Sequence, residues 1–106
     1  MSSRRLSADA RRFLAEHVGS VLQLELVLLL ARDPARAWTA ADAASELRAP
    51  AEWIGGRLAE LATLGVAATQ TDAYTFVADG PWAPAIDEVA TQFARRRTSI
   101  IEAIFG

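Results

Sequence analysis

Residues 38–77 place two short helical patterns on either side of a sharp break, and a hairpin pattern follows them. The break is Arg48-Ala49-Pro50, where the proline disfavours helical geometry in the residue before it. The second helical pattern ends at Leu64-Gly65, and glycine is the usual residue just past a helix C-terminus. The order therefore predicts a helix, a turn, a second helix and a β-hairpin.

Local signals give each of these two helices a start and a core face. Thr39, followed three residues later by Asp42, resembles a capping box in which Asp replaces the usual Glu. Pro50 suits the first position of the second helix, where its missing N–H has no cost. The positions expected to face the core are Ala43, Ala44 and Leu47 in the first helix and Ile54, Leu58 and Leu61 in the second.

Two strands are expected after Gly65, at residues 66–70 and 74–77, around a turn at Thr71-Asp72-Ala73. Aromatic and β-branched residues support the second strand, whereas the alanines of the first make it the weaker prediction. A short extended segment is also expected at Ala37-Trp38, before the first helix of the pair.

Two further helices are expected before residue 33. Ser7 can cap the first, which runs to about His17, and Ser20 can cap the second, at residues 21–32. The second is apolar on nearly every side, which is typical of a central, buried helix. Its aliphatic residues also fit a strand, but its length favours a helix, since strands usually stop at about eight residues. Asp33-Pro34 ends the pattern.

A final helix is expected at residues 83–105, with Pro84 near its start. At 1.5 Å per residue it would be a rod of roughly 33 Å. The domain has little left to bury so long an apolar stripe, so a second copy is the expected partner and the chain is predicted to form a homodimer. The predicted dimer seam consists of Ile86, Val89, Phe93, Ile100 and Ile104, with Arg97 in its one gap.

The chain is long enough for one hydrophobic core, since it has 106 residues, 52% of them apolar. A single domain is expected, divided into an N-terminal arm and helix (1–19), the helix-turn-helix with its hairpin (20–78) and the final helix (83–105). The absence of cysteine excludes disulfides and thiolate metal sites. The longest apolar run, residues 21–31, is too short to cross a bilayer. A soluble, cytoplasmic protein without a membrane partner is expected.

The formal net charge of −2 is unevenly distributed. Residues 1–12 carry four arginines against Asp9, a net charge of +3, and residues 95–106 carry three arginines against Glu102, a net charge of +2. Residues 13–94 carry four arginines against eleven carboxylates, a net charge of −7. The helix-turn-helix region is therefore acidic, and the positive charge is confined to the two ends.

Residues 39–77 resemble the winged helix-turn-helix of small bacterial regulators, of the general class that includes the MarR, ArsR and PadR families. The motif is a hydrophobic pattern with one glycine, made of Leu47, Ile54, Leu58, Leu61 and Leu64-Gly65-Val66. With the flanking helices, through which such regulators often dimerise, the resemblance covers about three quarters of the chain. It implies a mainly α fold with a small β-hairpin, as a winged helix-turn-helix with flanking N- and C-terminal helices.

By this resemblance the recognition helix spans residues 50–64, and its outward face carries Glu52, Trp53, Gly56, Arg57 and Glu60. Helices that read DNA normally carry Arg, Lys, Asn, Gln, Ser or Thr on this face. The expected wing tip, Gln70-Thr71-Asp72-Ala73, also has no cation. Because neutralising phosphates supplies most non-specific DNA affinity, this departure counts against ordinary DNA binding.

Two adjacent glycines, Gly55 and Gly56, interrupt the recognition helix, and each costs about 1 kcal/mol relative to alanine. Either the helix starts late or is loosely formed there, or something approaches its backbone closely. In the second case Trp53 is an adjacent anchor, since tryptophans dominate many protein interfaces. The alternative for Trp53 is burial against its own domain.

Catalysis is not expected, and neither is a cofactor. His17 is the only histidine, there is no lysine, and no local motif supports a Ser–His–Asp triad. Asp87 and Glu88 are adjacent helical residues that point in different directions, and both suit a first helical turn. The sequence has no glycine-rich phosphate loop, metal-ligand spacing or cofactor motif.

Two functions remain. The first is a homodimeric, DNA-associated transcriptional regulator in which Arg57 and the arginines at the two ends contact the phosphates of double-stranded DNA. The second is a winged helix that binds a protein partner through Trp53, Gly55 and Gly56. The terminal phosphate-contact candidates, whose other interpretation is a solvated charged face, are Arg4, Arg5, Arg11, Arg12, Arg95, Arg96 and Arg97.

Overall fold

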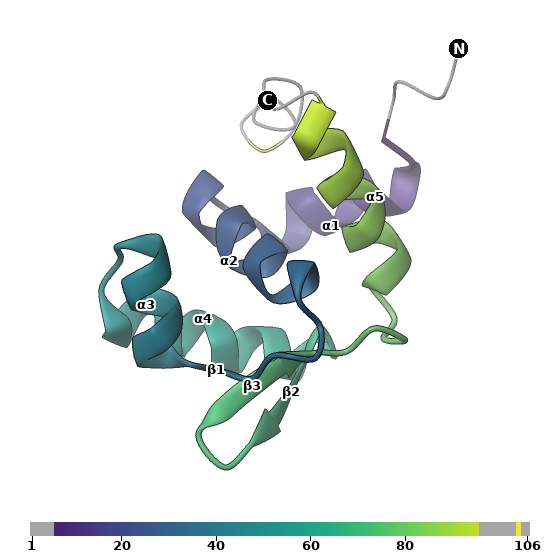
Figure 1. Ribbon diagram of the computed structural model, residues 1–106. Helices are drawn as coiled ribbons and strands as arrows, with labels where there is room; N and C mark the ends of the chain where they lie inside the picture. Colours follow the sequence, from purple (N-terminus) through teal and green to yellow (C-terminus); the bar gives the residue numbers. More distant parts are fainter. Residues whose placement is uncertain (1–5, 96–103, 105–106) are drawn as a thin grey trace.

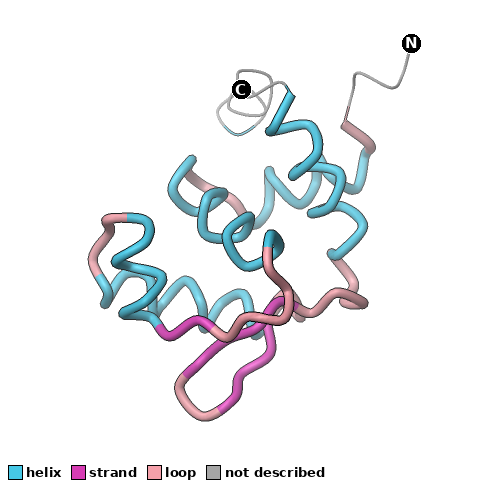
Figure 2. Tube along the Cα trace, viewed as in Figure 1, coloured by secondary structure: helices cyan, strands magenta, loops and turns pink. Residues whose placement is uncertain are grey.

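The computed structural model describes residues 6–95 and Ile104. This part of the chain is mainly helical, with a small three-stranded antiparallel sheet. In Figure 1, α1, α2 and α5 lie together above α3, α4 and the strands, and Figure 2 shows the strands at the base of the molecule. The elements are α1 (Ala8–His17), α2 (Val21–Arg32), β1 (Trp38–Thr39), α3 (Ala40–Leu47), α4 (Ala51–Thr63), β2 (Ala67–Gln70), β3 (Ala73–Phe76) and α5 (Ala83–Arg95).

Hydroxyl side chains begin three of the helices, as predicted. Ser7, Ser20 and Thr39 each accept a hydrogen bond from the backbone N–H three residues further on, at 3.0–3.2 Å. Each of them has an extended backbone, so its side-chain oxygen satisfies an N–H that the first helical turn leaves free. The predicted bounds of α1 and α2 are confirmed.

The break between α3 and α4 differs from the prediction by one residue. Arg48 ends α3 in the left-handed conformation, with a φ of 56°. Pro50 is the N-cap of α4 rather than its first helical residue, because its ψ of 130° is extended. Its carbonyl still accepts the first bond of the helix, from the backbone N–H of Ile54 at 3.0 Å.

Gly65 ends α4, as the sequence predicts. Its φ of 82° lies in the left-handed region, and the backbone N–H groups of Gly65 and Val66 donate to the carbonyls of Ala62 and Leu61. This pair of bonds is a Schellman motif, which satisfies carbonyls that the last turn leaves free. A Cβ atom on Gly80 would lie 2.5 Å from the carbonyl oxygen of Gly65, so Gly80 lets the loop before α5 pack against this helix end.

The three strands pair in the order β1-β3-β2, and both pairings are antiparallel. The predicted three-residue turn is wrong by one residue, because Ala73 pairs with Gln70 in the ladder. Thr71 has a φ of 56°, and this left-handed conformation lets the chain reverse between β2 and β3 within Thr71-Asp72. The predicted extended segment before α3 is present one residue later, as β1, and pairs with β3.

The core surrounds α2, which Figure 1 shows between α3 and α5. The predicted core residues of α4 are buried, as are Ala43 and Ala44 of α3, while Leu47 is partly buried. The buried residues of α2 are Leu24, Leu26, Val27, Leu29 and Leu30.

The core also includes two residues that the sequence assigns to a dimer seam. Ile86 and Val89 are each 1% exposed within a single chain, because α5 packs against α1 and α2. They therefore belong to the chain's own core. Phe93 and Ile104 are partly buried against that core, and Ile100 lies outside the described residues.

The described part of the predicted 83–105 helix is α5, which ends at Arg95, and Ile104, which is again helical. Among the described residues, none of the helices combines the length and the apolar character that a membrane span requires.

Candidate functional site

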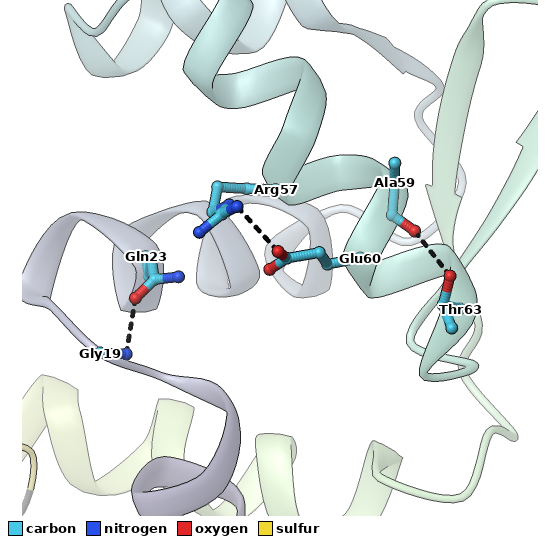
Figure 3. A network of polar contacts seen from close by, with 6 residues as sticks. All are labelled: Gly19, Gln23, Arg57, Ala59, Glu60 and Thr63. Atoms are coloured by element: carbon cyan, nitrogen blue, oxygen red, sulfur yellow. Dashed lines mark hydrogen bonds and ion pairs between the residues drawn. The ribbon is translucent and has the colours of Figure 1, made fainter.

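The face of α4 that points away from the core carries acidic and small side chains. Ile54, Leu58 and Leu61 are buried beneath it. The exposed residues of this helix, all of them described, include two carboxylates and no cation. They are Ala51, Glu52, Gly56, Ala59, Glu60 and Thr63. The Thr63 hydroxyl donates to the carbonyl of Ala59 at 3.2 Å, so it is already engaged within the helix (Figure 3).

The structure divides the five predicted surface residues of this helix into two groups. Glu52, Gly56 and Glu60 are exposed, whereas Trp53 and Arg57 are partly buried. Each of these two residues directly precedes a core position, Ile54 or Leu58, so a turn of 100° per residue places it at the edge of the buried face. Trp53 packs against the core, which matches in part the burial alternative for this side chain.

Arg57 is paired within its own helix. Its Nη2 atom donates to Glu60 Oε2 at 2.7 Å, and Figure 3 shows the two side chains turned toward each other. Its guanidinium carbon lies 5.7 Å from the centre of the Trp53 ring. The Nε atom is buried and has no hydrogen-bond partner among residues 6–95 and Ile104. The one arginine of α4 is thus only partly exposed, and a carboxylate opposes its charge.

The two glycines of α4 lie inside a continuous helix, so the explanation that the helix starts late is wrong. A Cβ atom on Gly55 would meet Ala40 Cβ at 3.7 Å, an ordinary contact distance. A Cβ atom on Gly56 would have nothing within 4 Å. No close contact with a described residue of this chain therefore requires glycine at either position.

The hairpin that follows α4 adds no positive charge. Residues 68–72 are exposed and contain Asp72 but no cation. Residues 40–77, which are all described, carry five carboxylates against Arg48 and Arg57. The helix-turn-helix with its hairpin therefore has a net charge of −3.

The structure describes only some of the terminal arginines. Arg11 and Arg12 are exposed on α1, and Arg12 Nε lies 4.0 Å from a carboxylate oxygen of Glu16. Arg95 is the last described residue of α5. The remaining candidates lie outside the described residues: Arg4, Arg5, Arg96 and Arg97.

The start of α1 lies next to α5, since the backbone N–H of Ser7 donates to Glu88 Oε2 at 2.6 Å. Figure 1 shows the start of α1 and the end of α5 on the side of the molecule opposite the hairpin. Within one chain, the described part of the structure therefore does not place the basic ends beside the hairpin.

His17 is partly buried in an aromatic cluster, with its ring 5.2 Å from that of Trp82 and 5.8 Å from that of Phe13. It also lines a cleft of about 430 Å³ between the end of α1 and the end of α4, together with Glu60 and Thr63. No pattern in the sequence indicates this cleft, because the two helix ends meet only through the fold. Among the described residues, no cluster of His, Asp or Glu side chains could hold a metal ion.

The sequence predicted the core face and the ends of α4, and the structure shows how far each of its predicted surface residues is exposed. The resulting surface carries acidic and small side chains, and the opposite face of the same helix is buried in the core. Comparisons of the chain with protein-family models, with curated proteins and with solved structures found no match.

Proposed function

We propose that this protein is a winged-helix module that binds a protein partner through the exposed face of α4. The observation that carries the proposal is the absence of any exposed cation on this helix, all of which is described. A helix that enters the major groove needs donors for base edges and cations for phosphates. Glu52 and Glu60 would instead repel the phosphates.

The winged-helix part of the proposal is supported by the order of the elements. A short helix, a tight turn, a second helix and a hairpin follow one another from α3 to β3, and β1 joins the hairpin. The buried residues of α4, Ile54, Leu58 and Leu61, belong to the hydrophobic pattern by which residues 39–77 resemble a winged helix-turn-helix.

Gly56 supports a protein partner. An exposed glycine inside a helix costs about 1 kcal/mol relative to alanine, and no neighbouring atom in the described chain requires it. Ala59 follows three residues later, so the two residues form a flat patch on which a partner backbone can lie closely. Glu52 and Glu60 border this patch and favour a partner with cationic side chains.

The test is affinity capture from the native cell with the full chain as bait, with and without nuclease. The wild type is compared with Gly56→Leu, which fills the patch, and with Ala41→Leu, which places the same side chain at an exposed position of α3. We expect a protein that survives nuclease treatment, is lost with Gly56→Leu and is retained with Ala41→Leu. A bound fraction that disappears with nuclease would contradict the proposal.

The second candidate is the DNA-associated regulator, which the arginines at the two ends favour. Arg11 is exposed and forms no ion pair with the rest of the described chain. A homodimer could bring the basic ends of two copies next to the recognition helices, where they would contact phosphates. This function predicts a dimer in light scattering, and duplex binding that falls steeply with salt and is lost when Arg95, Arg96 and Arg97 are neutralised.

A further inference from the structure

A groove of about 650 Å³ lies between α2, α5 and the end of α3, outside the α4 surface. Its apolar residues come from all three helices and include Leu28 and Leu29 of α2, Leu47 of α3 and Phe93 of α5. Leu29 is buried, while the other three are partly buried. The groove thus presents apolar surface that the described part of the chain leaves partly uncovered.

The rim of this groove is acidic. Among the described residues, Glu25 of α2, Glu46 of α3 and Asp87 of α5 line it, against the single positive charge of Arg32. None of these four side chains forms an ion pair with another described residue. The described residues of the rim therefore carry a net charge of −2, with carboxylates on all three walls.

The dimensions of the groove suit a helix. Its wall on α2 runs from Glu25 to Arg32 and its wall on α5 from Asp87 to Ala94, eight residues in each case. Eight residues of helix rise about 12 Å, or just over two turns. Two turns of a docked helix present apolar side chains to a groove at spacings of three or four residues.

We propose that this groove binds an amphipathic helix of another protein, one that carries Lys or Arg on both sides of an apolar stripe. The apolar stripe would cover Leu28 and Leu47. The flanking cations would face Glu25, Glu46 and Asp87, whose charges they complement. The proposal goes beyond the function assigned to α4, because the groove uses a different set of residues.

The test uses the full chain and a fluorescein-labelled model peptide of about four helical turns, with leucine on one face, lysine on both flanks and alanine elsewhere. Fluorescence anisotropy gives its affinity for the wild type, for Glu25→Lys/Glu46→Lys and for Asp72→Lys/Asp79→Lys. The last pair changes the net charge by the same amount, at exposed positions outside the groove. A peptide with glutamate in place of lysine controls for apolar binding.

We expect the groove variant to weaken binding of the lysine peptide by on the order of tenfold or more, because like charges across an interface repel. The matched variant should change it far less, and the glutamate peptide should not bind. Amide shifts in a ¹⁵N–¹H spectrum should be confined to α2, α5 and the end of α3. Equal weakening by both variants, or equal binding of both peptides, would overturn the proposal.

Light scattering on the same proteins distinguishes a second copy as the occupant. If the wild type is a dimer that becomes a monomer in Glu25→Lys/Glu46→Lys, the groove belongs to a self-association surface and the proposal is wrong. If the oligomeric state is the same in the wild type and both variants, self-association does not occupy the groove, and the peptide result decides.

Discussion

Arg57 Nη2 lies 2.7 Å from Glu60 Oε2, one helical turn further along α4. The Arg57 side chain is 32% exposed and that of Glu60 57%, so the pair lies at the protein surface and contributes at most about 1 kcal/mol to stability. The pair also bears on recognition, because the one arginine of α4 already has a carboxylate partner. A phosphate would have to compete with Glu60 and approach past Glu52.

Reversing the charges of α4 should create DNA affinity. We expect Glu52→Arg/Glu60→Arg to bind a random duplex more tightly than the wild type, with a slope of log K against log salt that is steeper by about two, because each new phosphate contact adds about 0.9 to the slope. Anisotropy at several salt concentrations measures it. A wild-type chain with a steep slope of its own would show that the acidic face does not prevent DNA binding.

Gly56→Ala should stabilise the protein. The added Cβ enters open space, and alanine favours a helix interior over glycine, so the free energy of unfolding should rise by about 0.5–1 kcal/mol in urea denaturation.

Gly65→Ala is the matched control, and it should destabilise the protein. Its φ of 82° is unfavourable for alanine, and the added Cβ would lie 3.2 Å from Pro81 Cδ. If Gly56→Ala also lowered the free energy of unfolding, the described environment of Gly56 would be incorrect.

Ile86→Ala should behave as a core substitution. Because the side chain is 1% exposed within one chain, we expect a loss of about 2–5 kcal/mol, and about 0.5–1.5 kcal/mol for the milder Ile86→Val. Both losses should be the same at low and high protein concentration in urea denaturation. A loss that shrinks on dilution would instead return Ile86 to a dimer seam, because a seam contact stabilises the chain only while the dimer is formed.

Arg36→Gln should lower the stability by about 0.5–2 kcal/mol. The guanidinium carbon of Arg36 lies 3.6 Å from the centre of the Trp38 ring, which is 2% exposed, so the stack is closed to solvent on one side. Arg32→Gln is the control, because no aromatic ring among the described residues pairs with Arg32. Thermal unfolding should separate the two variants, and equal melting temperatures would show that the stack contributes nothing.

Much of the fold could be predicted from neighbouring residues. The caps at Ser7, Ser20 and Thr39 and the end of α4 at Gly65 depend on one turn of backbone and its hydrogen bonds. The all-round apolar character of α2 likewise required a central position. The one-residue differences at Pro50 and Ala73 arose because a residue beside a helix start or a turn can satisfy either neighbouring conformation.

The sequence by itself determined the order of the elements, the core faces of α3 and α4 and the acidity of the helix-turn-helix, because periodicity, capping and charge are properties of short segments. Only the tertiary structure decided that Trp53 and Arg57 are half-buried, that Ile86 and Val89 belong to the chain's own core, and that three helices leave an acidic groove. These features depend on which helix covers which. That is set by packing between segments distant in the chain, and no local pattern encodes it.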